Sequence, residues 1–146
     1  MSRVEKSIRI NAPADKVFRF AADYQNWDVF FVGVSDVKPT TEKTWGDGSK
    51  FIYKATIMGI PMPVGTEIHS FVENEGWQGK SFKGIAEHRT EWIFEPVDTE
   101  TEFTFAVDYK MLVPILGDIL DKLIVKREWE GIVEGSLQNL KGIMEA

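Results

Sequence analysis

Hydroxyl-bearing side chains recur on the predicted inner face of several strands, among residues that are otherwise apolar. A hydroxyl group both donates and accepts hydrogen bonds, so a few of them can orient an apolar ligand through its carbonyl or hydroxyl oxygen. The same groups can instead bond to one another or to buried water. We expect roughly half of them to face a cavity. The residues concerned are Tyr53, Thr66, Ser70, Thr90 and Tyr109.

One of the two histidines is a candidate for proton transfer. His88 has the same strand parity as Thr90 and Trp92, so its imidazole can point into the interior. Glu87 and Arg89 flank it near a predicted turn, which favours instead a histidine at a strand end, close to solvent. Both interpretations stay open at this point.

Two charged residues interrupt the apolar stripe of the last predicted helix. Arg127 and Glu130 fall between Leu123 and Val133, near the side of the helix that faces inward. A charge pair there can anchor a ligand or transfer protons. Side chains three residues apart more often form a surface ion pair, worth about 0.2–0.5 kcal/mol.

No residue pattern of the chain indicates a metal or cofactor. The sequence has two histidines and no cysteine, so it offers neither a zinc thiolate nor a thiol nucleophile. It also lacks a glycine-rich phosphate loop, a Gly-x-Ser-x-Gly nucleophile elbow and a His-Glu-x-x-His zinc motif. We therefore expect no metal and no cofactor, and the nucleotide, acyl-transfer and zinc-hydrolase classes are disfavoured.

The composition is that of one water-soluble domain spanning residues 1–146. A chain of 146 residues buries roughly 68–70% of its unfolded surface, which suffices for a sizeable core. The formal net charge of −6 disfavours binding to nucleic acid, whose phosphates attract basic proteins. No apolar signal region and no run approaching about 18 apolar residues is found, so we expect a cytoplasmic protein without an integral membrane segment.

Hydropathy periodicity predicts an α+β domain in which one strand and two short helices precede six strands and a long helix. A half-buried strand over residues 4–10 stops before Pro13, which suits the first turn of a helix. That helix fades near Trp27, and after Pro114 apolar residues recur at helical spacing. The intervening strands are expected at residues 32–38, 50–57, 64–72, 77–86, 87–95 and 102–113.

The predicted meander leaves a candidate binding site against the last helix. Its tight turns are too short for parallel crossovers, so the sheet is antiparallel and curves around the helix. A helix cannot fill a concave sheet, and the gap between them is the candidate cavity. The side chains predicted to line it are Phe51, Tyr53, Ile57, Thr66, Ile68, Ser70, His88, Thr90, Trp92, Phe103, Phe105, Tyr109, Ile119, Leu120, Leu123 and Glu130.

Apolar connections gather at one end of the predicted sheet, because alternate turns of a meander lie at the same end. Turns are normally polar, so these segments either cover one another or form a portal that contacts a ligand, a membrane or a partner protein. The residues predicted for the cavity mouth are Phe30, Phe31, Ile60, Met62, Val113 and Leu116.

Several segments of the chain resemble a known superfamily. They are the opening stretch from Ser7 to Phe18, the turn into Trp27, the segment from Glu91 to Pro96, and residues 105–117. Together they are similar to the helix-grip (SRPBCC) superfamily of START domains, polyketide cyclases/dehydrases and birch-pollen-allergen type proteins, and most closely to its coenzyme Q-binding and polyketide-cyclase-like branch. The resemblance implies a seven-stranded sheet and an internal cavity for a hydrophobic small molecule. These families share no fixed catalytic triad, so no catalytic residue is carried over.

Three functional hypotheses follow. The first is a protein that binds an apolar small molecule, such as a lipid, quinone or polyketide-like compound, without a covalent step. The second is a cyclase, dehydratase or isomerase in which Tyr53, His88 or Tyr109 transfers protons. The third is a protein-interaction module that meets its partner through the apolar rim.

Overall fold

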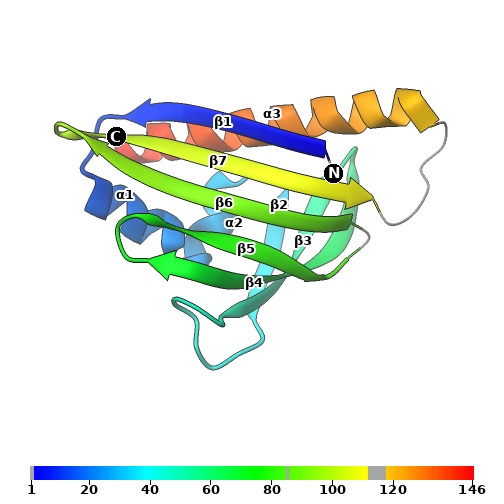
Figure 1. Cartoon of the computed structure of the whole chain (residues 1–146), viewed down its shortest axis with the longest axis horizontal. Helices are drawn as coiled ribbons and strands as arrows, with labels where there is room; N and C mark the ends of the chain where they lie inside the picture. The colour runs from blue at the N-terminus through cyan, green and yellow to red at the C-terminus, as the bar shows by residue number, and fades with distance from the viewer. Residues whose placement is uncertain (1, 85, 112–117) are drawn as a thin grey trace.

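The computed structural model describes residues 2–84, 86–111 and 118–146, without the side chains of residues 111 and 118–121. A strand comes first, helical segments and further strands follow, and a long helix comes last (Figure 1). The helical elements are α1 (Ala14–Ala22), the 3-10 turn η1 (Tyr24–Asn26), α2 (Trp27–Phe30) and α3 (Asp118–Met144). The strands are β1 (Ser2–Ile10), β2 (Val34–Pro39), β3 (Lys50–Ile57), β4 (Ile60–Val72), β5 (Gly76–Lys83), β6 (Ala86–Val97) and β7 (Glu100–Met111).

The strands form one seven-stranded antiparallel sheet in the order β1-β7-β6-β5-β4-β3-β2. Strands β2 to β7 are a meander, and β1 adds to the free edge of β7. Figure 1 shows the sheet curving, with α1, α2 and α3 all on its inner side. The predicted fold class is therefore confirmed: this is a helix-grip fold.

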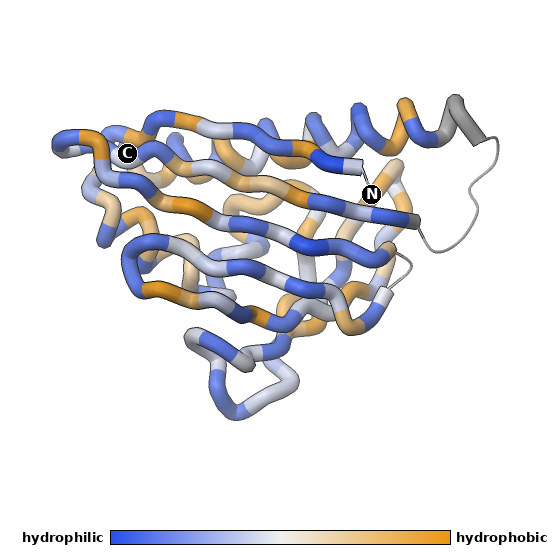
Figure 2. The backbone as a smooth tube through the Cα atoms, viewed as in Figure 1, coloured by the Kyte–Doolittle hydropathy of each residue, from blue (hydrophilic) through white to orange (hydrophobic). Residues whose placement is uncertain are grey.

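Alternation of apolar and polar residues gives the sheet its two faces. In β6, Trp92 and Phe94 are buried while the intervening Ile93 is exposed, and in β7 Phe103 and Phe105 are buried. Apolar and polar segments alternate along the strands in Figure 2. The inner face of β6 and β7 is therefore continuous and largely aromatic.

An aromatic core fills the end of the sheet that α1 covers. The helix begins after Pro13 and buries Phe18, whose ring makes edge contacts with Trp77 at 5.6 Å and Phe94 at 5.4 Å. Phe94 in turn stacks on Phe103 at 4.7 Å. A pocket of about 10 Å³ beside these rings, lined in part by Trp45, Phe71 and Trp77, has room for about one water molecule. The larger cavity lies farther along the sheet.

A β-bulge in β4 reverses the predicted orientation of its last residues. The register with β5 shifts between His69 and Val72, and Ser70 has a φ of 53°. Phe71 consequently turns inward, where its ring contacts that of Phe18 at 5.4 Å. Ser70 and Val72 are exposed. The prediction that Ser70 faces the interior is wrong, because the bulge adds one residue and shifts the alternation by one.

Helix α3 packs on the sheet through a stripe that includes the predicted Val133 but not the predicted Leu123. Steps of four back from the buried Leu137 lead to Val133, Trp129 and Val125, of which Val125 and Val133 are buried. Leu123 lies off this stripe and is 54% exposed, so the prediction that it faces inward is wrong. Among the helices that the structure describes, none is both long enough and apolar enough to cross a membrane.

Candidate functional site

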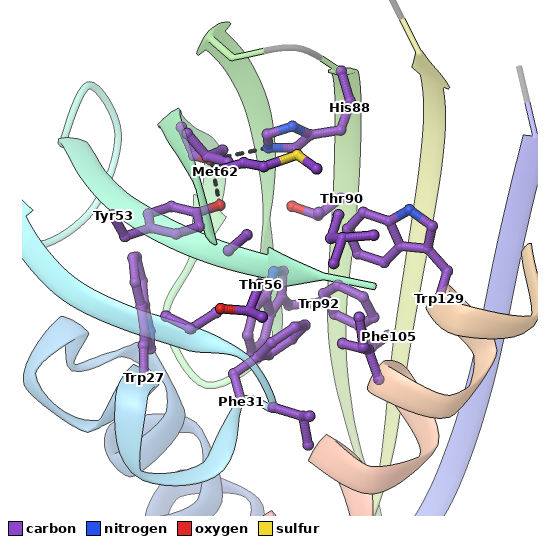
Figure 3. Close-up of a pocket in the computed structure, with 18 of the residues that line it drawn as sticks. Trp27, Phe31, Tyr53, Thr56, Met62, His88, Thr90, Trp92, Phe105 and Trp129 are labelled. Carbon is purple, nitrogen blue, oxygen red and sulfur yellow. Dashed lines mark hydrogen bonds between the residues drawn. The ribbon is translucent and has the colours of Figure 1, made fainter. Parts of the chain in front are cut away.

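A cavity of about 90 Å³ lies between the inner face of the sheet and the middle of α3 (Figure 3). About 10–15 Å³ of such space holds one water molecule, so the cavity has room for several waters or for a small organic molecule. One of its lining residues, Val32, is 39% exposed. The lining residues are Trp27, Phe31, Val32, Val34, Tyr53, Ala55, Thr56, Ile57, Met62, Val64, Thr66, Ile68, Trp77, Ala86, His88, Thr90, Trp92, Phe105, Trp129 and Ile132.

Aromatic side chains form much of the cavity wall. The ring of Phe31 lies 5.3 Å from Phe105 and 5.9 Å from Trp92. The Trp27 indole is fixed because its Nε1–H donates to the carbonyl of Ala21 at 2.8 Å. These rings offer flat, rigid, apolar surface, which suits a planar or hydrocarbon ligand.

A chain of three polar side chains occupies one part of the wall. The Tyr53 hydroxyl lies 2.9 Å from Thr66 Oγ1, and the same oxygen lies 3.0 Å from His88 Nε2. Figure 3 shows both hydrogen bonds, with the hydroxyl of Thr90 directed toward the same part of the cavity. The sheet positions these groups, since β3, β4 and β6 each present one inward-facing member.

Gly79 leaves the space that Thr66 and Thr90 occupy. These two threonines together with Tyr53 and His88 are called the polar group below. It pairs with Thr90 across β5 and β6 and with Ile68 across β4 and β5. A Cβ atom at this position would lie 2.5 Å from Thr90 Oγ1 and 2.9 Å from Thr66 Cγ2. Any side chain at residue 79 would therefore displace the polar group.

Burial keeps the polar group uncharged. It lowers the pKa of His88 from 6.5, against a hydrogen bond with the backbone of Ala86 that raises it. Burial likewise raises the pKa of Tyr53, against the hydrogen bond with Thr66 that lowers it. His88 is 6% exposed, so the interpretation of this residue as a solvent-facing strand end is wrong. Its charged sequence neighbours point to the other face of β6, where they are exposed.

Trp129 lines the cavity from α3. Its ring stacks on Tyr109 with centroids 5.4 Å apart, and its Nε1 is buried without a hydrogen-bond partner among the described residues. A buried N–H that lacks a partner is costly. No group of three or more His, Asp or Glu side chains suited to a metal ion occurs within the described part of the chain.

Many of the residues predicted for the interior line the cavity, and others do not. Phe51, Phe103 and Tyr109 are buried beside it, as is Phe30 from the predicted mouth. Glu130 is half-buried outside the lining, and Ile60 is 59% exposed at the β3–β4 turn. The side chains of Ile119 and Leu120, and residues Val113 and Leu116, lie outside the described residues. The predicted residues that do line the cavity are Phe31, Tyr53, Ile57, Met62, Thr66, Ile68, His88, Thr90, Trp92 and Phe105.

Several lining residues are not predicted by the sequence pattern. Trp129 could have been found from its spacing of four residues before Val133, which continues the buried stripe. Ala55, Thr56 and Ile57 are three successive residues that all line the cavity. Strict alternation along a strand would place Thr56 on the opposite face, so it does not predict this. The other lining residues that were not predicted are Trp27, Val32, Val34, Ala55, Val64, Trp77, Ala86 and Ile132.

The chain is similar to known proteins over nearly its whole length. Residues 1–145 match the sequence profile of a family described as polyketide cyclase/dehydrase and lipid transport. A comparison with curated protein sequences found no significant match.

Solved structures share the fold. The protein TTHA0849 from Thermus thermophilus is similar with a TM-score of 0.84 and 22% identity, over 97% of this chain and 95% of its own. A START superfamily protein from Mycobacterium smegmatis gives a TM-score of 0.79 at 15% identity, over 98% and 97% of the two chains. The Zhui aromatase/cyclase from Streptomyces sp. R1128 gives 0.75 at 19% identity, over 99% and 93%.

Proposed function

The chain belongs to the polyketide cyclase/dehydrase and lipid-transport family, and on this premise we propose that it binds a hydrophobic small molecule between the sheet and α3. The observation that carries the proposal is the cavity of about 90 Å³ with a mainly aliphatic and aromatic lining. Apolar cavities with a few convergent polar groups are the usual form of small-molecule sites.

Burial of apolar surface supplies the affinity. A ligand ring the size of an aromatic side chain buries about 150–250 Å², which is worth roughly 4–6 kcal/mol at about 25 cal/mol per Å². The loss of translational and rotational freedom offsets part of this gain. Hydrogen bonds from the polar group on β3, β4 and β6 then fix the orientation of the ligand.

The lining favours a neutral ligand. No Lys, Arg, Asp or Glu occurs among the described residues that line the cavity, and His88 is held neutral by burial. A carboxylate placed there would lose its hydration without gaining an opposite charge, which is strongly unfavourable. We therefore propose a neutral quinone, polyketide-like aromatic compound or lipid rather than a fatty-acid anion.

Tryptophan fluorescence can test this proposal, since Trp27, Trp77, Trp92 and Trp129 line the cavity. The full chain is titrated at pH 7.5 with 2-naphthol and with 2-naphthoate, which have the same ring system but differ in charge. We expect saturable binding of 2-naphthol and at least tenfold weaker binding of 2-naphthoate. Absence of saturable binding for 2-naphthol, or equal binding of both, contradicts the proposal.

A pair of variants locates the binding event. Ala55→Phe adds a ring inside the cavity and should abolish binding of 2-naphthol, because Ala55 is a lining residue. Val72→Phe adds a comparable ring at a residue that is 50% exposed on β4, outside the lining, and should leave binding unchanged. Equal effects of the two substitutions would place the binding site elsewhere.

One observation favours a second candidate function, catalysis of proton transfer in the same cavity. His88 is buried, neutral and hydrogen-bonded to Thr66, which allows it to accept a proton from a bound polyketide-like substrate. Turnover that rises with pH as His88 loses its proton, and that His88→Gln abolishes while ligand binding is retained, supports a cyclase or dehydratase. Unchanged turnover in His88→Gln contradicts it.

A further inference from the structure

Val32 is held against α3 at the edge of the cavity. Of the lining residues that the structure describes, it is the one large apolar residue that is exposed. Its backbone N–H donates to the Ser136 hydroxyl at 2.8 Å, and a Cβ atom at Gly135 would lie 3.1 Å from its side chain. Val32 is therefore in contact with the cavity, with α3 and with solvent.

One turn before Gly135, α3 has no side chain on its outer side. Gly131 is exposed, and a Cβ atom added there would meet no described atom within 4 Å. Successive residues of a helix point about 100° apart, so the next residue faces another way. That residue, Ile132, is buried and lines the cavity. At this turn α3 therefore borders the cavity on one side and open space on the other.

A further turn toward its start, α3 is connected to the β3–β4 hairpin by Glu128. The Met58 N–H donates to Glu128 Oε1 at 3.0 Å. Met58 and Gly59 both have positive φ and form a two-residue turn between the paired residues Ile57 and Ile60. Among the described residues, this is the one hydrogen bond that joins α3 to the hairpin.

Strand β3 completes a ring of contacts. The Thr56 N–H donates to the carbonyl of Gly33 at 2.8 Å, directly after Val32. Thr56 and Ile57 both line the cavity. Figure 3 shows Thr56 and Trp129 reaching the cavity from β3 and from α3. The region inside the ring is therefore bordered by cavity-lining residues on each side. The ring consists of Val32, Gly33, Thr56, Met58, Glu128 and Gly135.

We propose that this ring is the entrance to the cavity, that Gly131 keeps it open, and that the hydrogen bond between Met58 and Glu128 restricts its width. The inference rests on the proposed binding function and adds how a ligand reaches that site. An entrance is crossed both on entry and on exit, so a change in its width alters the association and dissociation rates together. The affinity, which depends on the bound state, stays the same.

Stopped-flow tryptophan fluorescence with 2-naphthol measures both rates on the full chain. Gly131→Phe places a ring at the entrance and should slow association and dissociation by about fivefold or more, with the Kd within about twofold of the original. Gly142→Phe is the matched control. Gly142 also lies in α3, and a Cβ atom there would meet no described atom within 4 Å, so both rates should stay unchanged.

Variants of Glu128 test the hydrogen bond to the hairpin. Glu128→Ala removes the acceptor and should speed both rates by about 2- to 10-fold, the effect of one net hydrogen bond. Glu128→Gln keeps an oxygen acceptor and should restore rates close to the original. Glu134→Ala removes a charge from an exposed position of α3 and should have no effect.

Quenching by acrylamide tests the entrance without a bound ligand. In a Trp45→Phe background, every remaining tryptophan lines the cavity. Acrylamide is small and neutral, so it can reach these rings through an open entrance. Gly131→Phe should lower the quenching constant to about half or less, because a narrower entrance slows the encounter, and Gly142→Phe should not.

The results separate the entrance from the binding function. Unchanged 2-naphthol rates in Gly131→Phe, or equal slowing in Gly142→Phe, overturn the inference and leave the binding function intact. Weaker binding with an unchanged association rate also overturns it, because the new ring then acts inside the cavity. If 2-naphthol does not bind at all, the binding function fails and acrylamide quenching alone decides whether the ring is an entrance.

Discussion

Gly79→Ala is a small change that should disturb the polar group of the cavity. The new Cβ would lie 2.5 Å from Thr90 Oγ1 and 2.9 Å from Thr66 Cγ2, both closer than normal contacts. Overpacking of this kind costs about 1–3 kcal/mol, because β-branched side chains have few alternative rotamers. Alanine also lowers the entropy of the unfolded chain relative to glycine, a gain of about 0.4–1 kcal/mol. The net expectation is a loss of about 1–2 kcal/mol.

Urea unfolding followed by tryptophan fluorescence measures this loss. Gly131→Ala is the matched control, because a Cβ at residue 131 meets no atom within 4 Å and the residue lies inside α3. There the same substitution should stabilise the protein by up to about 1 kcal/mol, the difference in helix propensity. Opposite signs for the two substitutions separate the contact effect from the general effect of replacing glycine.

The double variant Gly79→Ala/Thr90→Ala identifies the contact responsible. Removing the Thr90 hydroxyl removes the shorter of the two contacts, so part of the lost stability should return. A Gly79→Ala protein as stable as the original, with unchanged binding of 2-naphthol, would refute this explanation of how the polar group is positioned.

Further substitutions test the core, the cavity and the effect of pH. Leu137→Ala should lower the free energy of unfolding by about 2–5 kcal/mol, whereas Leu123→Ala, at a residue 54% exposed, should cost well under 1 kcal/mol in the same urea experiment. Ser136→Ala should lower the free energy of unfolding by about 1–3 kcal/mol. The backbone N–H of Val32 donates to the Ser136 hydroxyl at 2.8 Å and would lose this partner. Because burial lowers the pKa of His88 from 6.5, the unfolded chain takes up a proton below about pH 6.5 that the folded chain does not, and stability falls there by at most about 1.4 kcal/mol per pH unit. His88→Gln should reduce this loss of stability below about pH 6.5; an unchanged loss in His88→Gln contradicts the assignment.

The sequence predicts the fold well because strand alternation and helix periodicity are local signals. On β3 and β6, the inward side chains Tyr53, His88 and Trp92 follow directly from parity. The charged neighbours Glu87 and Arg89 suggest a solvent-facing His88, but their side chains lie on the opposite face of the strand.

Other features depend on contacts that a sequence does not display. The bulge at Ser70 requires a positive φ, and serine has no special preference for positive φ values. The local sequence pattern therefore does not predict the bulge. The bond between Thr66 and His88 joins residues 22 positions apart and depends on the register of three strands. Hydropathy periodicity predicts an inward Leu123, which is in fact exposed, because the periodicity does not specify which side of α3 packs on the sheet.

A crystal structure of the protein grown with 2-naphthol tests the binding proposal most directly. The account predicts density for the naphthol ring within the cavity, between the sheet and α3, with its oxygen about 3 Å from the Tyr53 hydroxyl. Naphthol bound only on the outer surface, or a cavity closed by side chains with no ligand inside, would contradict it.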